Sequence, residues 1–206
     1  MKIRVLAVSS AALLLGACGG LLETTIPAPQ SYVLRLPART PSAAAARGGT
    51  LLVQRPEAGP GLESDRIVLL RSDNRFDTYA ASRWAAPAPD MLEALMIDGL
   101  RGGGAFSGVF DDSSPYAPRY VARCAMRRFE ADYTAGDTPT IFVALDCTLG
   151  RHRDRSLLAS FTAQGSAPAR ADRLNDVVAA FSTATQAAVG ELERQAAAAV
   201  ANEPAQ

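Results

Sequence analysis

Apolar and polar residues alternate along several parts of the chain, which is the pattern of strands with one buried face. The three longest stretches of this kind cover residues 119–131, 139–149 and 156–164. In the last of them, every second residue from Leu157 to Ala163 is apolar. Because only short segments separate the three stretches, we expect them to form an antiparallel meander.

Shorter extended stretches come before the meander. They cover residues 31–36, 50–54, 66–70, 75–79 and 106–110. The segment Ser72–Asn74 separates two of them and favours a hairpin turn. Two segments that contain proline and glycine, 37–49 and 55–64, are expected to be loops.

Two further segments have the period of amphipathic helices. The first begins near Pro87 and Asp90, and Gly102–Gly104 is typical of its end. Its apolar face comprises Met91, Leu92, Leu95, Met96 and Leu100. The second helix is predicted over residues 171–200, with Asp172 near its N-cap and fraying from Ala196 onward. Its apolar stripe comprises Leu174, Val177, Val178, Phe181, Thr185, Ala188, Val189 and Leu192.

These elements predict one α+β domain over residues 31–200. Its sheet is expected to be antiparallel or mixed, with a three-strand C-terminal meander packed by two helices. Residues 201–206 are expected to be a frayed tail. The length of 206 residues is enough for a single domain with a sizeable core.

The N-terminus has the parts of an export signal. Lys2 and Arg4 make its start basic, and residues 5–15 are an apolar run too short to span a bilayer. The sequence Leu-Gly-Ala-Cys at 15–18 resembles the lipobox of bacterial lipoproteins, whose cysteine receives the lipid. An uncleaved anchor and an ordinary secretory signal with an incidental cysteine are the alternatives.

The lipobox resemblance implies three boundaries. Residues 1–17 would be the signal peptide, Cys18 would carry the acyl chains (palmitate among them), and residues 18–30 would be a tether. Gly19 stands where retention in the inner membrane of enteric bacteria favours aspartate. The expected location is therefore the outer membrane, with the domain facing the periplasm.

Two cysteines remain once Cys18 is assigned to lipid. A hairpin folded about the bond between Ala135 and Gly136 would place Cys124 opposite Cys147, with both on the apolar faces of their strands. Exported proteins keep disulfides, so a Cys124–Cys147 bridge is one expectation. Two buried free thiols are the other, since a bulge near Arg127 would change the register.

Composition and motifs exclude several classes of function. The 21 basic and 21 acidic residues balance, which argues against a nucleic-acid partner. Lys2 is the only lysine, so the mature chain has none for a phosphate-binding loop of the Walker type. His152 is the only histidine, and the cysteine spacing does not fit a metal site. We therefore expect no catalytic residue, metal or cofactor, and a protein that is not an enzyme.

Arginines form the most conspicuous charged pattern. Arg119, Arg123 and Arg127 would share one strand face, and a neighbouring turn contains Arg151, Arg153 and Arg155. Arg123 and Arg127 are candidates for contact with lipid headgroups or an acidic partner. The alternative is a solvated outer face. Trp84, the only tryptophan, is a third candidate for such a contact, against a role in the core.

Several segments between Asp65 and Glu193 resemble the ABC-type transport auxiliary lipoprotein family, the PqiC/YmbA-like proteins. They are the strand pair at 65–74, the Arg-Trp-Ala-Ala-Pro segment at 83–87, and the strand from Tyr120 to Phe129-Glu130. Residues 31–34 resemble the short strand that follows the lipobox in this family. Ala86 departs from the pattern, because an acidic residue is usual there.

The resemblance implies a non-catalytic, lipid-anchored subunit of an envelope lipid transport system that supports membrane integrity. Its expected partners are an MCE-domain protein, a permease and an ATPase, and a homo-oligomer is also implied. The domain would dock these partners or hand lipid over at the outer membrane. The alternative is a structural or assembly lipoprotein of the outer membrane that has no transport substrate.

Overall fold

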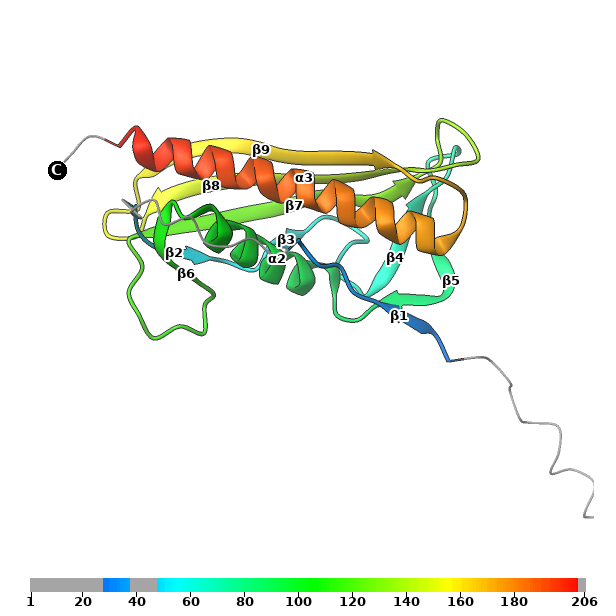
Figure 1. Ribbon diagram of the computed structural model, residues 1–206, viewed down its shortest axis with the longest axis horizontal. Coiled ribbons are helices and arrows are strands. Elements are labelled where there is room, and N and C mark those ends of the chain that lie inside the picture. The colour runs from blue at the N-terminus through cyan, green and yellow to red at the C-terminus, as the bar shows by residue number, and fades with distance from the viewer. Residues whose placement is uncertain (1–27, 38–47, 204–206) are drawn as a thin grey trace, which may run out of the picture.

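The computed structural model describes residues 28–37 and 48–203, which form one mixed sheet with two helices on one face (Figure 1). The helices are α2 (Ala88–Gly103) and α3 (Leu174–Ala201). The strands are β1 (Gln30–Tyr32), β2 (Gly48–Val53), β3 (Glu57–Ala58), β4 (Arg66–Leu70), β5 (Phe76–Trp84), β6 (Phe106–Phe110), β7 (Tyr120–Asp132), β8 (Thr140–Arg151) and β9 (Leu157–Pro168). The predicted α+β class is therefore confirmed, and the sheet is of the mixed kind.

Strand β7 joins the two parts of the sheet. Along one edge it pairs in parallel with β2, β3 and β4, one after another. Along the other edge it pairs with β8 in antiparallel register, and β8 pairs with β9. The expected C-terminal meander is thus present, and β1 to β6 complete the sheet beside it.

The β7–β8 hairpin brings the two cysteines together. Cys124 and Cys147 are directly opposite each other, and a disulfide joins them. A bulge between Met126 and Arg128 shifts the register by one residue on the turn side of this pair, so the pairing at the cysteines is unaffected. The bulge also turns Phe129 into the core, where 2% of it is exposed.

The core lies between the sheet and the helices. Trp84 at the end of β5 packs against Phe129 of β7 and Phe181 of α3, with ring centroids 5.7 Å and 5.1 Å away. Helix α3 approaches β9 so closely that a β-carbon on Gly165 would be 2.1 Å from the carbonyl oxygen of Ala184. A residue without a side chain is required at this contact.

The observed ends of several strands differ from the predicted ones. Strand β1 ends at Tyr32, whereas a strand to residue 36 was expected, and a two-residue strand, β3, lies in the expected loop 55–64. Leu157 was expected on the apolar face of β9, but it is 64% exposed. A register shift where β9 begins, between Leu149 and Gly150 of β8, accounts for its outward position.

The ends of α3 also differ from the prediction. The N-cap is Arg173, without a side-chain bond, because Asp172 accepts a hydrogen bond from Tyr133 instead. At the other end the helix is regular to Ala201, and the following Glu203 is not frayed. Its side chain is 5% exposed and accepts hydrogen bonds from Tyr120 and Arg151, which fixes the C-terminal turn to β7 and β8. Residues 204–206 lie outside the described residues.

A chain of hydroxyl groups connects the β5 strand, the end of β7 and the start of α3. The Tyr133 hydroxyl donates to Asp172 at 2.6 Å and lies 2.7 Å from the Tyr79 hydroxyl. Since Tyr133 gives its single hydrogen to Asp172, Tyr79 is the donor in the other bond. Burial, followed by the bond to the Asp172 carboxylate, raises the pKa of Tyr133, so its phenol stays protonated.

Removing the disulfide should destabilise the domain. The bridge closes a loop with a sequence separation of 23 residues. On the chain-entropy model this loop contributes about 3 kcal/mol, so Cys124→Ser/Cys147→Ser should lower the free energy of unfolding in urea by about that amount. Reduction of the wild-type domain gives the matched measurement without a change of side chain. An unfolding midpoint that does not move on reduction would contradict this prediction.

The variant Tyr133→Phe should lower the free energy of unfolding by about 1–2 kcal/mol, because Tyr79 and Asp172 each lose a partner in a half-buried site. Tyr116→Phe is the matched control. Tyr116 is 73% exposed, so the loss of its hydroxyl should change stability little. Equal effects of the two substitutions in urea unfolding would refute a structural role for the hydroxyl chain.

Candidate functional site

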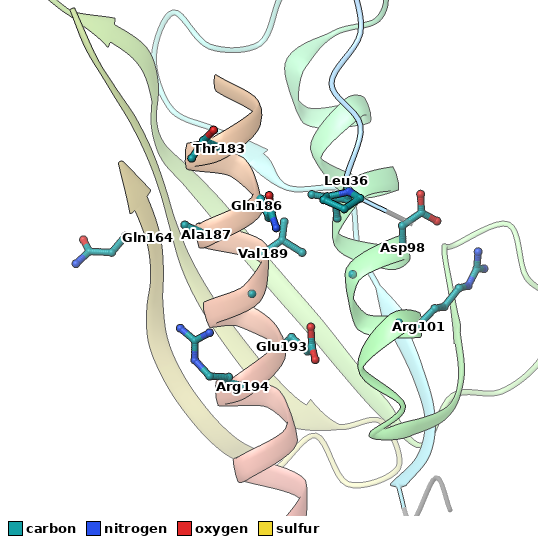
Figure 2. Close-up of a pocket in the computed structure, with 14 residues that line it drawn as sticks. Leu36, Asp98, Arg101, Gln164, Thr183, Gln186, Ala187, Val189, Glu193 and Arg194 are labelled. Atoms are coloured by element: carbon teal, nitrogen blue, oxygen red, sulfur yellow. The ribbon is translucent and has the colours of Figure 1, made fainter. Parts of the chain in front are cut away.

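The largest hollow described is an open groove between α2 and α3, of about 800 Å³ (Figure 2). The two helices approach closely at its floor because α2 carries glycines there. A β-carbon on Gly99 would be 2.2 Å from Cγ1 of Val189, and one on Gly103 would be 2.5 Å from Glu193. The groove is lined by Leu36, Pro37, Asp98, Gly99, Arg101, Gly102, Gln164, Thr183, Gln186, Ala187, Val189, Gly190, Glu193 and Arg194.

The lining of this groove combines small and apolar residues with polar and charged ones. Figure 2 shows Glu193 on the side of α3 that faces α2, whereas Asp98 and Arg101 extend from the side of α2 turned away from α3, and Arg194 extends from the other side of α3. Arg101 is fixed by a 2.9 Å hydrogen bond from Nε to the carbonyl oxygen of Val109, and Arg194 is bonded to Glu191. The volume lies within the range of about 300–1,000 Å³ that is usual for small-molecule sites.

A second hollow of about 490 Å³ adjoins the first. Leu36 and Asp98 line both of them. The segment from Val33 to Leu36 lies across α2 at this point, and Val33 is 52% exposed. An apolar surface therefore continues from the groove toward β1.

The predicted lipidation site, Cys18, lies outside the described residues, as do the signal peptide and residues 18–27 of the tether. Cys124 and Cys147 are buried in the core on the helix side of the sheet, with 5% and 1% of each exposed. Their disulfide therefore supports the fold and is not part of a surface site.

Trp84 cannot contact a partner or a lipid headgroup in this structure, which corrects one of the sequence-based candidates. The residue is fully buried, and its ring is held between Phe129 and Phe181. Two large aromatic neighbours and a position at the end of β5 explain the burial, since a tryptophan contributes the largest apolar area available to a core.

Arg123 and Arg127 lie on the outer face of β7, opposite the helices. Arg127 donates to Asp146 of β8 at 2.7 Å, so its charge is partly compensated. Arg123 is exposed and has no hydrogen-bond or ion-pair partner within residues 28–37 and 48–203. Arg119 is not free, because it lies 3.6 Å from the carboxylate of Glu203.

In the part of the chain that the structure describes, histidine, cysteine and carboxylate side chains do not form a group of three or more that could hold a metal ion. His152 is exposed in the turn between β8 and β9, and its backbone N–H donates to Arg119. Asp111 accepts two hydrogen bonds from Ser113, which lower the pKa of its carboxyl. Neither described helix is both long and apolar enough to cross a membrane.

The sequence did not reveal the interhelical groove. A signal was available in Gly99 and Gly103, four residues apart on α2, since this spacing places them on one helix face. Gly190 on α3 widens the space, because a β-carbon there would be no closer than 3.6 Å to another group. Of these glycines only Gly103, within Gly102–Gly104, was interpreted from the sequence, and only as part of a helix end. The role of all three in helix contact depends on which helix lies opposite.

Solved structures share this architecture. A crystal structure from Xanthomonas campestris, of the DUF330 family, has a TM-score of 0.70 with 27% sequence identity, and covers 84% of this chain and 94% of its own. An uncharacterized protein has a TM-score of 0.64 at 14% identity, covering 82% of this chain and 99% of its own. A hypothetical protein from Chlamydia trachomatis has a TM-score of 0.54 at 7% identity, covering 76% and 99%, which shows the fold alone.

No curated protein sequence is significantly similar to the chain. A family model does match, however, and it covers residues 32–193. That family consists of auxiliary lipoproteins of ABC-type transport, so membership implies anchoring in the cell envelope and association with an ABC transport system. The match covers both helices but for the end of α3, and nearly all of the sheet. The chain therefore belongs to the family of ABC-type transport auxiliary lipoprotein components.

Proposed function

We propose that this protein is a non-catalytic, lipid-anchored subunit of an envelope lipid transport system, which works with an MCE-domain protein, a permease and an ATPase. The observation that carries the proposal is the family match over residues 32–193. The lipobox at residues 15–18 supports it independently, because it provides a lipid attachment site before the matched domain.

The anchor would hold the domain close to the outer membrane, on its periplasmic side. Each acyl CH₂ that enters the bilayer contributes about 0.8 kcal/mol, so several chains on Cys18 make attachment effectively permanent. The tether between Cys18 and Gln30 spans at most about 40 Å when fully extended. The domain therefore works within reach of one membrane surface and of partners that approach it.

Lipid handover would use the interhelical groove. It has a volume of about 800 Å³, small and apolar residues form part of its lining, and Leu36 connects it to the second hollow. Apolar surface that is rimmed by polar groups is typical of sites for partly apolar ligands. Arg101 and Arg194 are the two arginines that line the groove, and arginine binds phosphate oxygens well.

Exchange of residues 1–18 for a cleavable secretory signal without a lipobox should release the protein from the membrane fraction into the soluble periplasm. The acyl chains are then absent, while the domain is unchanged. Labelling with a palmitate analogue should mark the wild type and not the exchanged protein. Continued sedimentation of the exchanged protein with outer membranes would contradict the anchor.

Purification of the lipidated wild type tests the proposed partners. The tagged wild type, purified from native membranes in mild detergent, should bring with it an MCE-domain protein, a permease and an ATPase. Recovery of an outer-membrane assembly complex instead would favour the structural alternative. Recovery of none of these components would refute the transport assignment.

Filling the groove should impair lipid transport without unfolding the protein. In Gly190→Trp the first atom of the new side chain fits without a clash, since a β-carbon at this position would lie 3.6 Å from the guanidinium of Arg194. We expect the rate of lipid transfer to fall at least severalfold. Ala179→Trp is the matched control, because Ala179 is exposed on the same helix and does not line the groove. Equal transfer rates for the two variants would exclude the groove as a lipid site.

A further inference from the structure

Two loops meet at the end of the molecule where α3 finishes (Figure 1). One is the turn between β8 and β9, and the other precedes β7. They are joined by a 2.9 Å hydrogen bond from the backbone N–H of His152 to the carbonyl oxygen of Arg119. We call the surface formed by Tyr116, Arg153, Arg155 and Leu157 the distal surface.

The two arginines of the distal surface are not used by the fold. Arg153 and Arg155 are exposed and have no hydrogen-bond or ion-pair partner among the described residues. Their neighbour Arg151 differs, because it is bound to Glu203 at 2.5 Å. Arg155 also has a φ of 58°, a conformation that favours glycine or asparagine. The side chain at this position is therefore not explained by backbone preference or by an internal contact.

Two large hydrophobic side chains are exposed in or next to these two loops. Tyr116 is 73% exposed and Leu157 is 64% exposed. Leu157 follows Arg155 by two residues, and Tyr116 precedes Arg119 in the adjoining loop. Arginine and tyrosine together, with an aliphatic group, are enriched where proteins bind proteins.

Acidic groups near the distal surface do not neutralise it. Asp154 accepts two hydrogen bonds from Ser156 and lies 3.7 Å from Arg151. Glu203 is 5% exposed and is shared by Arg151 and Arg119. Asp111 and Asp112 lie close enough to Glu93 of α2 to raise the pKa of its carboxyl, after burial. In these two loops the charged residues without a hydrogen-bond or ion-pair partner among the described residues are Asp112, Arg153 and Arg155, and the two that belong to the distal surface are positive.

The distal surface lies far from the point where the tether enters the domain. At that point Tyr32 of β1 contacts Asn175, the second residue of α3. The distal surface adjoins Glu203, just after the helix ends. Since α3 has 28 residues, the two sites are about 40 Å apart along the helix.

We propose that the distal surface docks an acidic surface of the transporter's periplasmic subunit. This inference rests on the proposed function, since it takes the anchor and the transporter from there. The guanidinium groups of Arg153 and Arg155 pair with carboxylates of the partner, and Tyr116 and Leu157 provide the apolar contact. A protein is favoured over a lipid surface, because the tether joins the molecule to its own membrane at the opposite end.

The test uses the mature lipidated protein in nanodiscs and, as probe, the purified periplasmic part of the MCE-domain subunit. Arg153→Glu/Arg155→Glu should weaken binding at least tenfold, because two attractive contacts become repulsive. Arg35→Glu/Arg75→Glu is the control, with the same change in charge at exposed positions outside the distal surface, and should bind like the wild type. Unfolding midpoints of all three proteins show that the fold is intact.

Three outcomes overturn the inference. Equal binding by the wild type and Arg153→Glu/Arg155→Glu overturns it and leaves the proposed function standing. Absence of any binding by the wild type overturns the proposed partner and the docking surface together. Sedimentation of the unlipidated domain with phosphatidylglycerol vesicles, lost in Arg153→Glu/Arg155→Glu, would show that the surface binds an anionic membrane instead of a protein.

Discussion

The pairing of β7 along both of its edges is the constraint on which the structure depends. Its first residues pair with β2, its middle with β3 and its end with β4, while the whole strand pairs with β8 on the other side. Three short strands could not form a stable sheet alone, because an isolated strand pair is marginal in water. One strand of 13 residues therefore sets their order beside the hairpin of β8 and β9, on which α3 packs.

Sequence patterns predicted the parts of the fold that form between neighbours in the chain. The position of Cys124 opposite Cys147 was predicted by counting residues outward from one turn. The bulge shifts the register by one residue between this turn and the cysteines, and Cys124 and Cys147 are paired as predicted. The pairing of β2 with β7 joins Leu51 to Tyr120 and is parallel, so no local turn specifies it. The position of Glu203 was missed for the same reason, since its partner Arg151 is 52 residues away.

The candidate site was less predictable than the fold. An arginine on an alternating strand is expected to face solvent, and Arg123 and Arg127 do so. Whether such an arginine has an ion-pair partner depends on the neighbouring strand, where Asp146 pairs with Arg127. Trp84 was ambiguous because a large amphipathic side chain suits both a core and an interface, and only the positions of Phe129 and Phe181 decide between them.

The distribution of charge separates groups that maintain the fold from groups that are available for contact. Glu130 is buried, which raises the pKa of its carboxyl, and Arg128 opposes this effect through a 2.5 Å bond. Hydrogen bonds from Tyr120 and Arg151 lower the pKa of Glu203. The partners of Glu203 therefore favour its ionised form, whereas at Glu130 burial and the bond to Arg128 act in opposite directions. The arginines without partners lie at the surface, where a charge can act on another molecule by attraction alone.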